Sequence, residues 1–351
     1  MTSPRPVAGL PPSLSAIVRS TPEDFVVREQ LGFVPDGSGE HAFLHLEKRG
    51  LNTQDLAQRI ADFSAVPLRD IGFSGMKDRN AVTSQWFSVG LAGRAEPDWQ
   101  RLSERGDVWV LGASRHARKL RRGVHRGNHF CLTLRQLRGD MQSLIQALEQ
   151  VRSEGVPNYF GEQRFGRNGS TLLQARNWQE RGGRRITRTK RGLFLSALRS
   201  QLFNSLLAAR VEAGTWNQVL PGDACMLQGT RSQFACEAVD ADIERRAAGG
   251  DIHPALPLWG TGKPLQGVER RSEQSAVLAA EQAVCEFLEA TGLQLDYRPA
   301  RALADDFCWK FCDDGSLRLE FGLGPGSYAT AVLAQIIQYK QGDTGGGNGR
   351  E

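Results

Sequence analysis

The sequence has little of what marks a secreted or membrane protein. Its 351 residues include only six cysteines, spread between Cys131 and Cys312, which is not the dense spacing of a small domain held by disulfides. No run of about 18 uncharged apolar residues occurs, and prolines occupy the N-terminal stretch where a signal peptide needs an apolar core. We therefore expect reduced thiols, no membrane partner and a cytoplasmic location.

Motifs that bind a cofactor or a metal are also missing. The glycine-rich stretch 322–327 lacks the spacing of a dinucleotide-binding loop, and Pro264 follows Lys263 where a phosphate-binding loop needs Ser or Thr. Cys308 and Cys312 have the spacing of a metal-binding pair, but no second pair lies at the usual distance, so we expect core thiols. The sequence thus predicts neither a metal nor an organic cofactor.

The composition is that of a folded globular protein with a moderate excess of positive charge. Hydrophobic residues make up 40% of the chain and charged residues 24%, and the net charge is +5. At roughly 150 residues per domain, the length predicts about two domains. The positive excess is compatible with a polyanionic partner but does not require one.

Periodic patterns predict strand-rich ends and a helix-rich middle. The predicted strands cover 41–47, 85–91, 108–111 and 129–135, and a hairpin covers 307–321 with Asp314 and Gly315 in its turn. In strand 41–47 the alternation directs Ala42, Leu44 and Leu46 to one face. The predicted helices begin after the caps Asn52 and Asp140, the second with Met141 and Ile145 on its apolar side, and cover 193–213 and 275–290.

This pattern predicts an α+β domain interrupted by an insertion. Residues 16–165 and 297–341 form the discontinuous outer domain, and residues 166–296 form the inserted one. The Pro-rich lead 1–15 and the Gly-rich tail 342–351 cannot bury enough apolar area to offset the entropy of ordering. We expect both ends to be flexible.

Positive charge is concentrated in two runs that contain no acidic residue. The runs are RHARKLRRGVHR (115–126) and RGGRRITRTKR (181–191). One such run is often only a solvated face, but two runs in a chain with so small an excess favour contact with a phosphate backbone. The candidate RNA-binding residues are Arg115, Arg118, Lys119, Arg121, Arg122, Arg126, Arg184, Arg185, Arg188, Lys190 and Arg191.

The segment 72–89 contains a candidate catalytic carboxylate. Asp78 lies between Lys77 and Arg79, cations that would favour an ionised group able to act as nucleophile or base. A plain turn aspartate is the alternative.

The first basic run leads into a candidate base-binding strand. Period 2 places Asn128 and Phe130 on one face of it, and an amide beside an aromatic ring can bind an unstacked base. A core phenylalanine is the alternative.

The sequence resembles the TruD family of tRNA pseudouridine synthases. The strongest segment is GMKDRNAVTSQW (75–86), which is similar to the catalytic signature of the family. The other segments are PEDFVVRE (22–29), HAFLHLEKRGLNT (41–53), RGNHF (126–130), VPNYFGEQRFG (156–166) and PGSYATAV (325–332). Together they extend over nearly the whole chain.

The resemblance implies an isomerase that acts on tRNA. Members of this family break the N-glycosidic bond of a uridine, turn the base and rejoin it through C5 to C1′, normally at position 13, without metal or organic cofactor. It also implies a catalytic domain with a mixed, mostly antiparallel sheet and an inserted α/β TRUD domain. The implied partner is tRNA, with glutamate tRNA the expected species, and no protein partner is implied.

The resemblance further implies roles for single residues. Asp78 is the catalytic aspartate, which attacks C1′ or takes the C2′ proton to form a glycal. Phe130 stacks on the target base, and Asn128 braces the aspartate loop. Arg19 is expected to pair with Asp78 at a position where the family often has lysine, and Lys77 is expected to support the site.

Two other classes of protein are compatible with these sequence features. A different RNA-modifying enzyme, such as a methyltransferase, would need a glycine-rich cofactor loop of the correct spacing. A noncatalytic RNA-binding protein would use the basic runs and leave Asp78 as a turn residue. Isomerisation is mass-neutral, whereas methylation adds mass and binding leaves uridine, so the RNA product separates all three.

Overall fold

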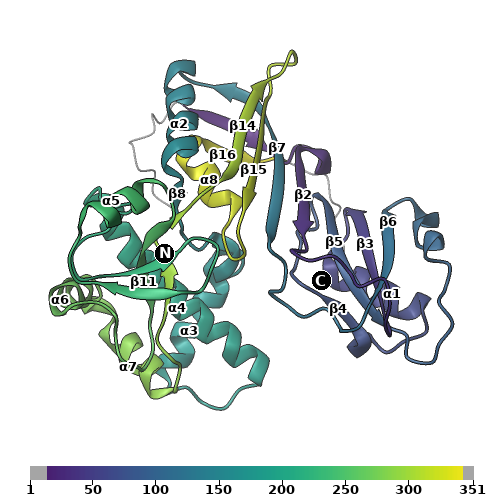
Figure 1. Ribbon diagram of the computed structural model, residues 1–351, viewed down its shortest axis with the longest axis horizontal. Coiled ribbons are helices and arrows are strands. Elements are labelled where there is room, and N and C mark those ends of the chain that lie inside the picture. The colour runs from purple at the N-terminus through teal and green to yellow at the C-terminus, as the bar shows by residue number, and fades with distance from the viewer. Residues whose placement is uncertain (1–13, 343–351) are drawn as a thin grey trace. The chain divides into compact units, whose positions relative to one another are not determined.

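The structure, a computed structural model, describes residues 14–342. By their contacts these residues form two units (Figure 1). We call residues 14–140, 305–326 and 338–342 the sheet unit, and residues 141–304 and 327–337 the helical unit. The predicted insertion, 166–296, lies within the helical unit. That 166–296 form a domain of their own stays a prediction.

The sheet unit is built on a ten-stranded sheet. Its strands are β1 (Ser15–Val18), β2 (Phe25–Gln30), β3 (His41–Arg49), β4 (Ile71–Phe73), β5 (Val82–Gly90), β6 (Val108–His116), β7 (Gly127–Arg138), β14 (Asp305–Phe311), β15 (Leu317–Leu323) and β16 (Gln338–Gln341). The main order is β14-β15-β7-β2-β5-β3-β6, while β1 pairs with β7 and β16, and β4 with β5. Among the described strand pairs of this sheet only β2/β5 and β1/β16 are parallel, so the predicted mixed, mostly antiparallel sheet is confirmed.

Helix α1 (Thr53–Phe63) packs against one face of this sheet (Figure 1). Its buried Leu56 and Ile60 belong to one apolar cluster with Leu44 and other inward residues of β3 and β5. Asn52 caps the helix as predicted, because its Oδ1 accepts a hydrogen bond of 2.8 Å from the Asp55 amide, a contact worth about 1 kcal/mol.

The opposite face of the sheet is also covered near β3. Phe43, which the alternation directs away from α1, is fully buried with Leu31 and Leu120, and Trp86 packs against this group. Leu120 comes from the loop that contains the first basic run. Strand β3 is therefore buried on both faces, which the predicted one-sided alternation missed. Strands β5 and β6 also have different limits from the predicted ones.

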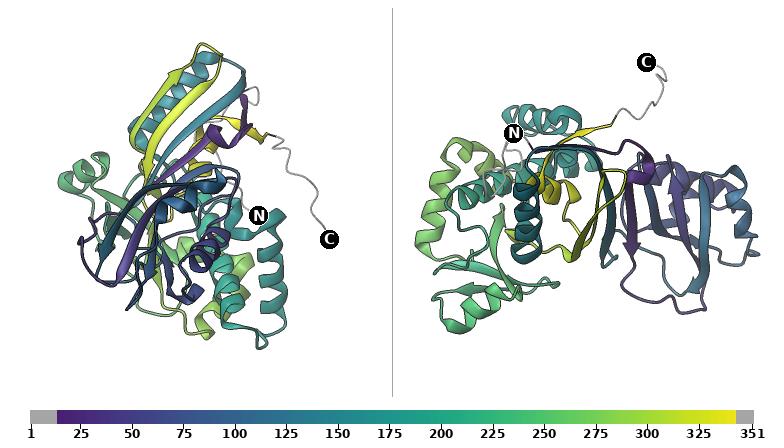
Figure 2. Two further views of the ribbon diagram at one scale, coloured as in Figure 1. Left: turned by 90° about the vertical axis from the view of Figure 1, so that its right-hand side faces the viewer. Right: turned by 90° about the horizontal axis from the view of Figure 1, so that it is seen from above.

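The predicted hairpin is confirmed in β14 and β15, which lie beside β7 (Figure 2). Gly315 has a φ of 74°, and the Asp314 carboxylate accepts a hydrogen bond of 3.0 Å from the Ser316 amide. The predicted core position of the two thiols is wrong. Cys308 is exposed because β14 is at the end of the main strand order and only partly covered, and Cys312 is half-buried in the turn after β14.

The helical unit contains helices and two small sheets. Its helices are α2 (Met141–Glu154), α3 (Ser170–Glu180), α4 (Arg188–Glu212), α5 (Ala241–Ala248), α6 (Val268–Val277), α7 (Gln282–Ala290) and α8 (Ala329–Ile336). Strands β10 (Gln233–Cys236), β9 (Asp223–Leu227), β11 (Ile252–Leu258) and β12 (Asp296–Pro299) form one sheet, and β8 (Val156–Pro157) pairs with β13 (Arg301–Ala302). Much of α4 is buried in the main core of this unit.

The helices of this unit differ from the predicted ones at their limits. Helix α4 begins before the predicted range 193–213 because Thr187 caps it, with its hydroxyl accepting from the Lys190 amide at 3.4 Å. The predicted helix 275–290 is broken between α6 and α7, and the break lets Leu278, only 2% exposed, enter the core.

Helix α2 buries a narrower stripe than its apolar pattern predicted. Leu144, Ala147 and Leu148 are buried, whereas Met141 and Ile145 are 44% and 43% exposed. The successive 100° steps of a helix place these two residues on the flank of the stripe.

Short 3-10 helices connect the other elements. They are Pro22–Asp24, Leu68–Asp70, Trp99–Arg105, Glu162–Phe165, Arg167–Gly169 and Ala279–Glu281. Within the described residues, no helix has the length and apolar character needed to cross a membrane.

Three residues of the predicted flexible ends, 14, 15 and 342, are part of the fold. Leu14 is buried, Ser15 begins β1, and the Gly342 amide donates to the Val18 carbonyl at 2.8 Å. Backbone pairing of β1 with β16 draws these residues into the sheet. The rest of the predicted lead and tail, 1–13 and 343–351, lies outside the described residues.

Candidate active site

Asp78 lies on the loop 74–81 that connects β4 to β5. Its side chain is 37% exposed, and its Oδ2 is 2.5 Å from the guanidinium of Arg19. Such a charge-assisted bond fixes the orientation of a carboxylate. The structure therefore brings together the two residues that the family resemblance pairs.

Arg19 follows β1 in an unusual backbone conformation. Its φ of 62° is in the left-handed region, which costs a side-chain-bearing residue about 1–2 kcal/mol. The guanidinium also lies over the ring of Phe25, 3.8 Å from the centroid, and its Nε is buried with no hydrogen-bond partner in the described part of the chain. Strain that persists beside a carboxylate is typical of functional sites.

Lys48, which no sequence pattern marked as a site residue, holds the Asp78 loop through hydrogen bonds. Its side chain is fully buried, and the ammonium donates to the carbonyl oxygens of Leu51 at 2.5 Å and Asp78 at 3.0 Å. Burial lowers the pKa of Lys48 to about 8, against the opposing effect of the Asp78 charge. The sequence did contain a signal for this burial: Lys48 lies two residues after Leu46, on the inward face of the alternating strand β3.

Lys77 contacts a different partner from the one its sequence position indicated. Its ammonium forms a 2.5 Å ion pair with Glu29, and both side chains are almost completely buried. The Arg79 Nε donates to the Gly50 carbonyl at 3.1 Å. Because β2 lies next to β5, Glu29 is within reach of Lys77 and takes it as its partner. The cation that contacts the Asp78 carboxylate is instead Arg19.

Buried polar side chains fix the same loop at two further points. The Thr53 hydroxyl accepts a hydrogen bond of 2.9 Å from the Lys77 amide and donates one of 2.9 Å to Gln85 Oε1. The Gln85 amide nitrogen donates to the Gly75 carbonyl at 3.4 Å. The loop is thus held by α1, β3 and β5, so Asp78 projects from a preorganised support.

Asn128 and Phe130 share one face of β7, as predicted. In the ladder with β2, Asn128 lies opposite Glu29 and Phe130 opposite Val27. The Oδ1 of Asn128 is buried without a hydrogen-bond partner within the described residues. The structure of residues 14–342 shows no hydrogen bond from this amide to the aspartate loop, so the bracing role of Asn128 stays a prediction.

The Phe130 ring belongs to an aromatic stack and is only 8% exposed. It stacks on Phe321 at 5.4 Å between centroids, and the edge of Phe25 lies at 6.3 Å. Because Arg19 covers Phe25, continuous contacts link Phe130 to Arg19 and from there to Asp78.

The first basic run begins at the end of β6 and covers the loop 117–126, which is hydrogen-bonded to the aspartate loop. Leu120 anchors it, with its amide donating to the Ser88 hydroxyl at 2.9 Å, and the Gly123 amide donates to the Ser74 carbonyl at 2.7 Å. The exposed arginines of this run are Arg118, Arg121, Arg122 and Arg126.

Two other residues of the first run have partners within the protein. Arg115 forms a 2.8 Å ion pair with Glu96, and the Lys119 ammonium donates to the Arg69 carbonyl. Glu96 therefore offsets the charge of Arg115, whereas Lys119 keeps its full charge on an ammonium held at Arg69.

The second basic run belongs to the helical unit. Lys190 lies over the Phe194 ring at 5.3 Å, and Arg191 donates to the Thr291 carbonyl at 3.2 Å. Arg184, Arg185 and Arg188 are the remaining charged candidates of this run. Across residues 14–342, no group of three or more His, Cys, Asp or Glu side chains is placed to hold a metal ion.

This arrangement defines a site for nucleophilic or acid–base chemistry beside a basic surface. A partly exposed carboxylate on a rigid loop can attack or deprotonate a substrate, and the adjoining arginines of the loop 117–126 favour an anionic one.

Comparisons with known proteins identify the family. A family model described as tRNA pseudouridine synthase D (TruD) matches residues 11–173 and 170–336. A tRNA pseudouridine synthase D from Methylococcus capsulatus is 45% identical over 322 residues, which are 92% of this chain and 91% of the relative. One from Nitrosococcus oceani is 43% identical over 335 residues, 95% of this chain and 93% of the relative. The chain therefore belongs to the TruD family.

A solved structure shares the fold. The crystal structure of a protein from Methanosarcina mazei, described as a putative tRNA pseudouridine synthase D, has a TM-score of 0.70 at 19% identity and covers 96% of both chains. The family and the α+β fold that the sequence motifs predicted are both confirmed.

Proposed function

We propose that the protein isomerises uridine to pseudouridine in tRNA, at position 13 and with glutamate tRNA among its substrates, and that Asp78 is the catalytic residue. Membership of the TruD family supports the reaction and the RNA class. The observation that carries the residue assignment is the Asp78 carboxylate itself, which is partly exposed and paired with Arg19 on a loop held by buried polar groups. With tRNA as substrate, we place the protein in the cytoplasm.

The proposed reaction moves the uracil from N1 to C5 attachment without net change in atoms. The N1–C1′ bond breaks, the base turns, a C5–C1′ bond forms, and the proton on C5 is lost while N1 gains one. Asp78 supplies either a nucleophile for C1′ or a base for the C2′ proton. The Arg19 guanidinium holds the carboxylate in one orientation through both steps.

The residues around Asp78 have supporting roles in this proposal. The uridine must leave the RNA stack to expose C1′, at a cost of a few kcal/mol. Phe130 offsets part of this cost by stacking on the base. Asn128 braces the aspartate loop, and its amide oxygen has no other partner among residues 14–342. The Lys77–Glu29 pair keeps the loop in place, and the exposed arginines of both basic runs bind phosphates.

One experiment tests both the reaction and the residue. Purified protein is incubated with unmodified glutamate tRNA, and pseudouridine is mapped by carbodiimide labelling and quantified by nucleoside mass spectrometry. We expect one new pseudouridine at position 13 with the wild type and with Asp313→Asn, a control at an exposed aspartate of the β14–β15 turn. Asp78→Asn should bind the tRNA and form no product.

Any other RNA product of this experiment contradicts or corrects one part of the proposal. Appreciable pseudouridine from Asp78→Asn contradicts the assignment of Asp78. Unchanged uridine with wild-type protein favours a noncatalytic RNA-binding protein, and a mass increase favours a methyltransferase. A pseudouridine elsewhere in the tRNA leaves the reaction intact and corrects its position.

A further inference from the structure

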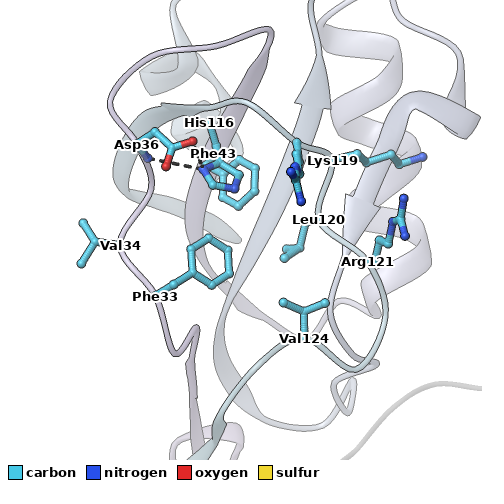
Figure 3. Close-up of a pocket in the computed structure, with 10 residues that line it drawn as sticks. Phe33, Val34, Asp36, Phe43, His116, Lys119, Leu120, Arg121 and Val124 are labelled. Atoms are coloured by element: carbon cyan, nitrogen blue, oxygen red, sulfur yellow. Dashed lines mark hydrogen bonds and ion pairs between the residues drawn. The ribbon is translucent and has the colours of Figure 1, made fainter.

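A pocket in the sheet unit lies apart from the groups that hold Asp78. It has a volume of about 720 Å³, and Figure 3 shows its walls. Phe33 lies on the segment after β2, whereas Leu120 and Val124 lie across the space on the loop 117–126. Phe43 and His116 lie behind them, on the sheet face opposite α1.

Three aromatic rings of this pocket contact one another. Phe33 lies 6.2 Å from Phe43 and 5.2 Å from His116, and the latter two rings are 4.8 Å apart. Phe43 is fully buried, but Phe33 is 37% exposed. The pocket thus presents an exposed ring that is held in place by rings behind it.

Hydrogen bonds hold the segment that carries Phe33. The Asp36 Oδ2 lies 2.7 Å from the His116 Nδ1 and accepts from the Ala117 amide at 3.1 Å, and the Gly37 amide donates to the Arg115 carbonyl at 2.9 Å. Gly39 approaches so closely that a Cβ there would lie 2.5 Å from the His116 carbonyl group. The pocket is therefore formed before any molecule binds.

The charge on the pocket selects an anionic molecule. Arg118 and Arg121 line it and are exposed, and in the described part of the chain neither guanidinium has an acidic partner. Asp36, the acidic residue of the lining, already faces His116. Exposed aromatic rings beside unpaired arginines are typical of sites for unstacked bases, whose phosphates the arginines hold.

The loop 117–126 connects this pocket to the aspartate loop. Leu120 and Val124 line the pocket, while Gly123, between them, donates to the Ser74 carbonyl at the start of the loop 74–81. The same RNA can therefore contact both sites. We propose that the pocket binds one unpaired nucleotide of the substrate RNA, other than the uridine that reacts, with its base on Phe33 and its adjoining phosphates on Arg118 and Arg121.

The identity of the RNA in this inference rests on the proposed function, so the test measures binding without catalysis. Variants are made in Asp78→Asn protein, and the dissociation constant for unmodified tRNA is measured at fixed salt. Stacking of one base corresponds to an affinity change of about 5- to 150-fold. We expect a loss of this size for Phe33→Ala and a value near that of the parent for Phe33→Tyr, which keeps the aromatic face.

Two further variants separate stacking from general apolar contact. Phe33→Leu keeps apolar volume and the packing on Phe43 but has no π-face, so it should also bind weakly. Phe311→Ala removes a ring on β14 that is similarly exposed, at 39%, but lies outside the pocket, so its affinity should match the parent. Ultraviolet cross-linking followed by peptide mapping should recover RNA on the peptide that contains Phe33.

The outcomes separate this inference from the proposed function. Equal affinity of Phe33→Ala and the parent, or of Phe33→Leu and Phe33→Tyr, overturns the nucleotide pocket. If the wild-type protein forms no pseudouridine but Phe33→Ala still weakens RNA binding, the proposed function is wrong and the nucleotide pocket is supported.

Discussion

The ammonium of Lys48 donates a hydrogen bond of 3.0 Å to the main-chain carbonyl of Asp78. The bond joins the end of β3 to the loop that carries the candidate catalytic carboxylate, and a second bond to Leu51 fixes the ammonium itself. Because the Lys48 side chain is fully buried, this support is shielded from competition with water. Lys48 is thus a positioning residue for Asp78.

Replacing Lys48 by methionine should lower the turnover number more than the affinity for tRNA. The change keeps most of the side-chain volume but leaves two carbonyls without their donor, so the loop can shift, and a displacement of about 1 Å can cost around 100-fold in rate. Single-turnover rates and dissociation constants, measured separately, check this. The control is Lys310→Met, an exposed lysine on β14, and equal rates for both variants would argue against the positioning role.

The stability of the protein should depend on pH through Lys48. Burial lowers the pKa of this lysine from 10.5 to about 8, so between these values the unfolded chain binds more protons than the folded one. The free energy of unfolding therefore contains a Lys48 contribution that is least favourable below pH 8 and rises by ~1 kcal/mol per pH unit between about pH 8 and 10.5. Urea denaturation of wild type and Lys48→Met at about pH 7.5, 8.5 and 9.5 isolates this contribution. A constant difference between the two proteins across this range would contradict the prediction.

Two substitutions of Arg19 should separate its chemical role from its backbone strain. Arg19→Ala and Arg19→Gly both remove the guanidinium from Asp78, so both should lose at least about tenfold in single-turnover rate. The φ of 62° is strained for alanine but not for glycine, so Arg19→Gly should be the more stable of the two by ~1 kcal/mol. Thermal and urea unfolding measure this difference. If alanine were as stable as glycine, the left-handed conformation would not be imposed by the fold.

The exposed arginines of the first basic run should control the salt dependence of tRNA binding. Changing Arg118, Arg121 and Arg122 to glutamine should lower the slope of log affinity against log salt by about one unit for each phosphate that the variant no longer neutralises. Arg115→Gln should change the slope much less, because Arg115 is already paired with Glu96. Binding titrations at several salt concentrations give the slopes, and an unchanged slope for the triple variant would mean that this run is only a solvated face.

Much of the local structure follows from residues that are neighbours in sequence. Asn52 caps α1 because its side chain reaches an amide three residues later, and Asp314 and Gly315 form the hairpin turn because that conformation suits them. The segment that contains Asp78 and the family to which the chain belongs were likewise predictable from short motifs. Interactions of this kind involve only a few adjacent residues, so they do not depend on where distant strands lie.

The partners of the site residues depend instead on strand order. Lys77 pairs with Glu29 rather than flanking Asp78, and Lys48 lies beneath the loop, because β5 is placed between β2 and β3. The second face of the sheet is covered by the loop 117–126. This loop buries Phe43 and forms one wall of the pocket beside it. These contacts join residues tens of positions apart, and their free energy comes from packing and desolvation that arise only in the assembled fold. The motifs therefore determined the family and the candidate carboxylate, whereas only the tertiary structure decided what holds that carboxylate in place.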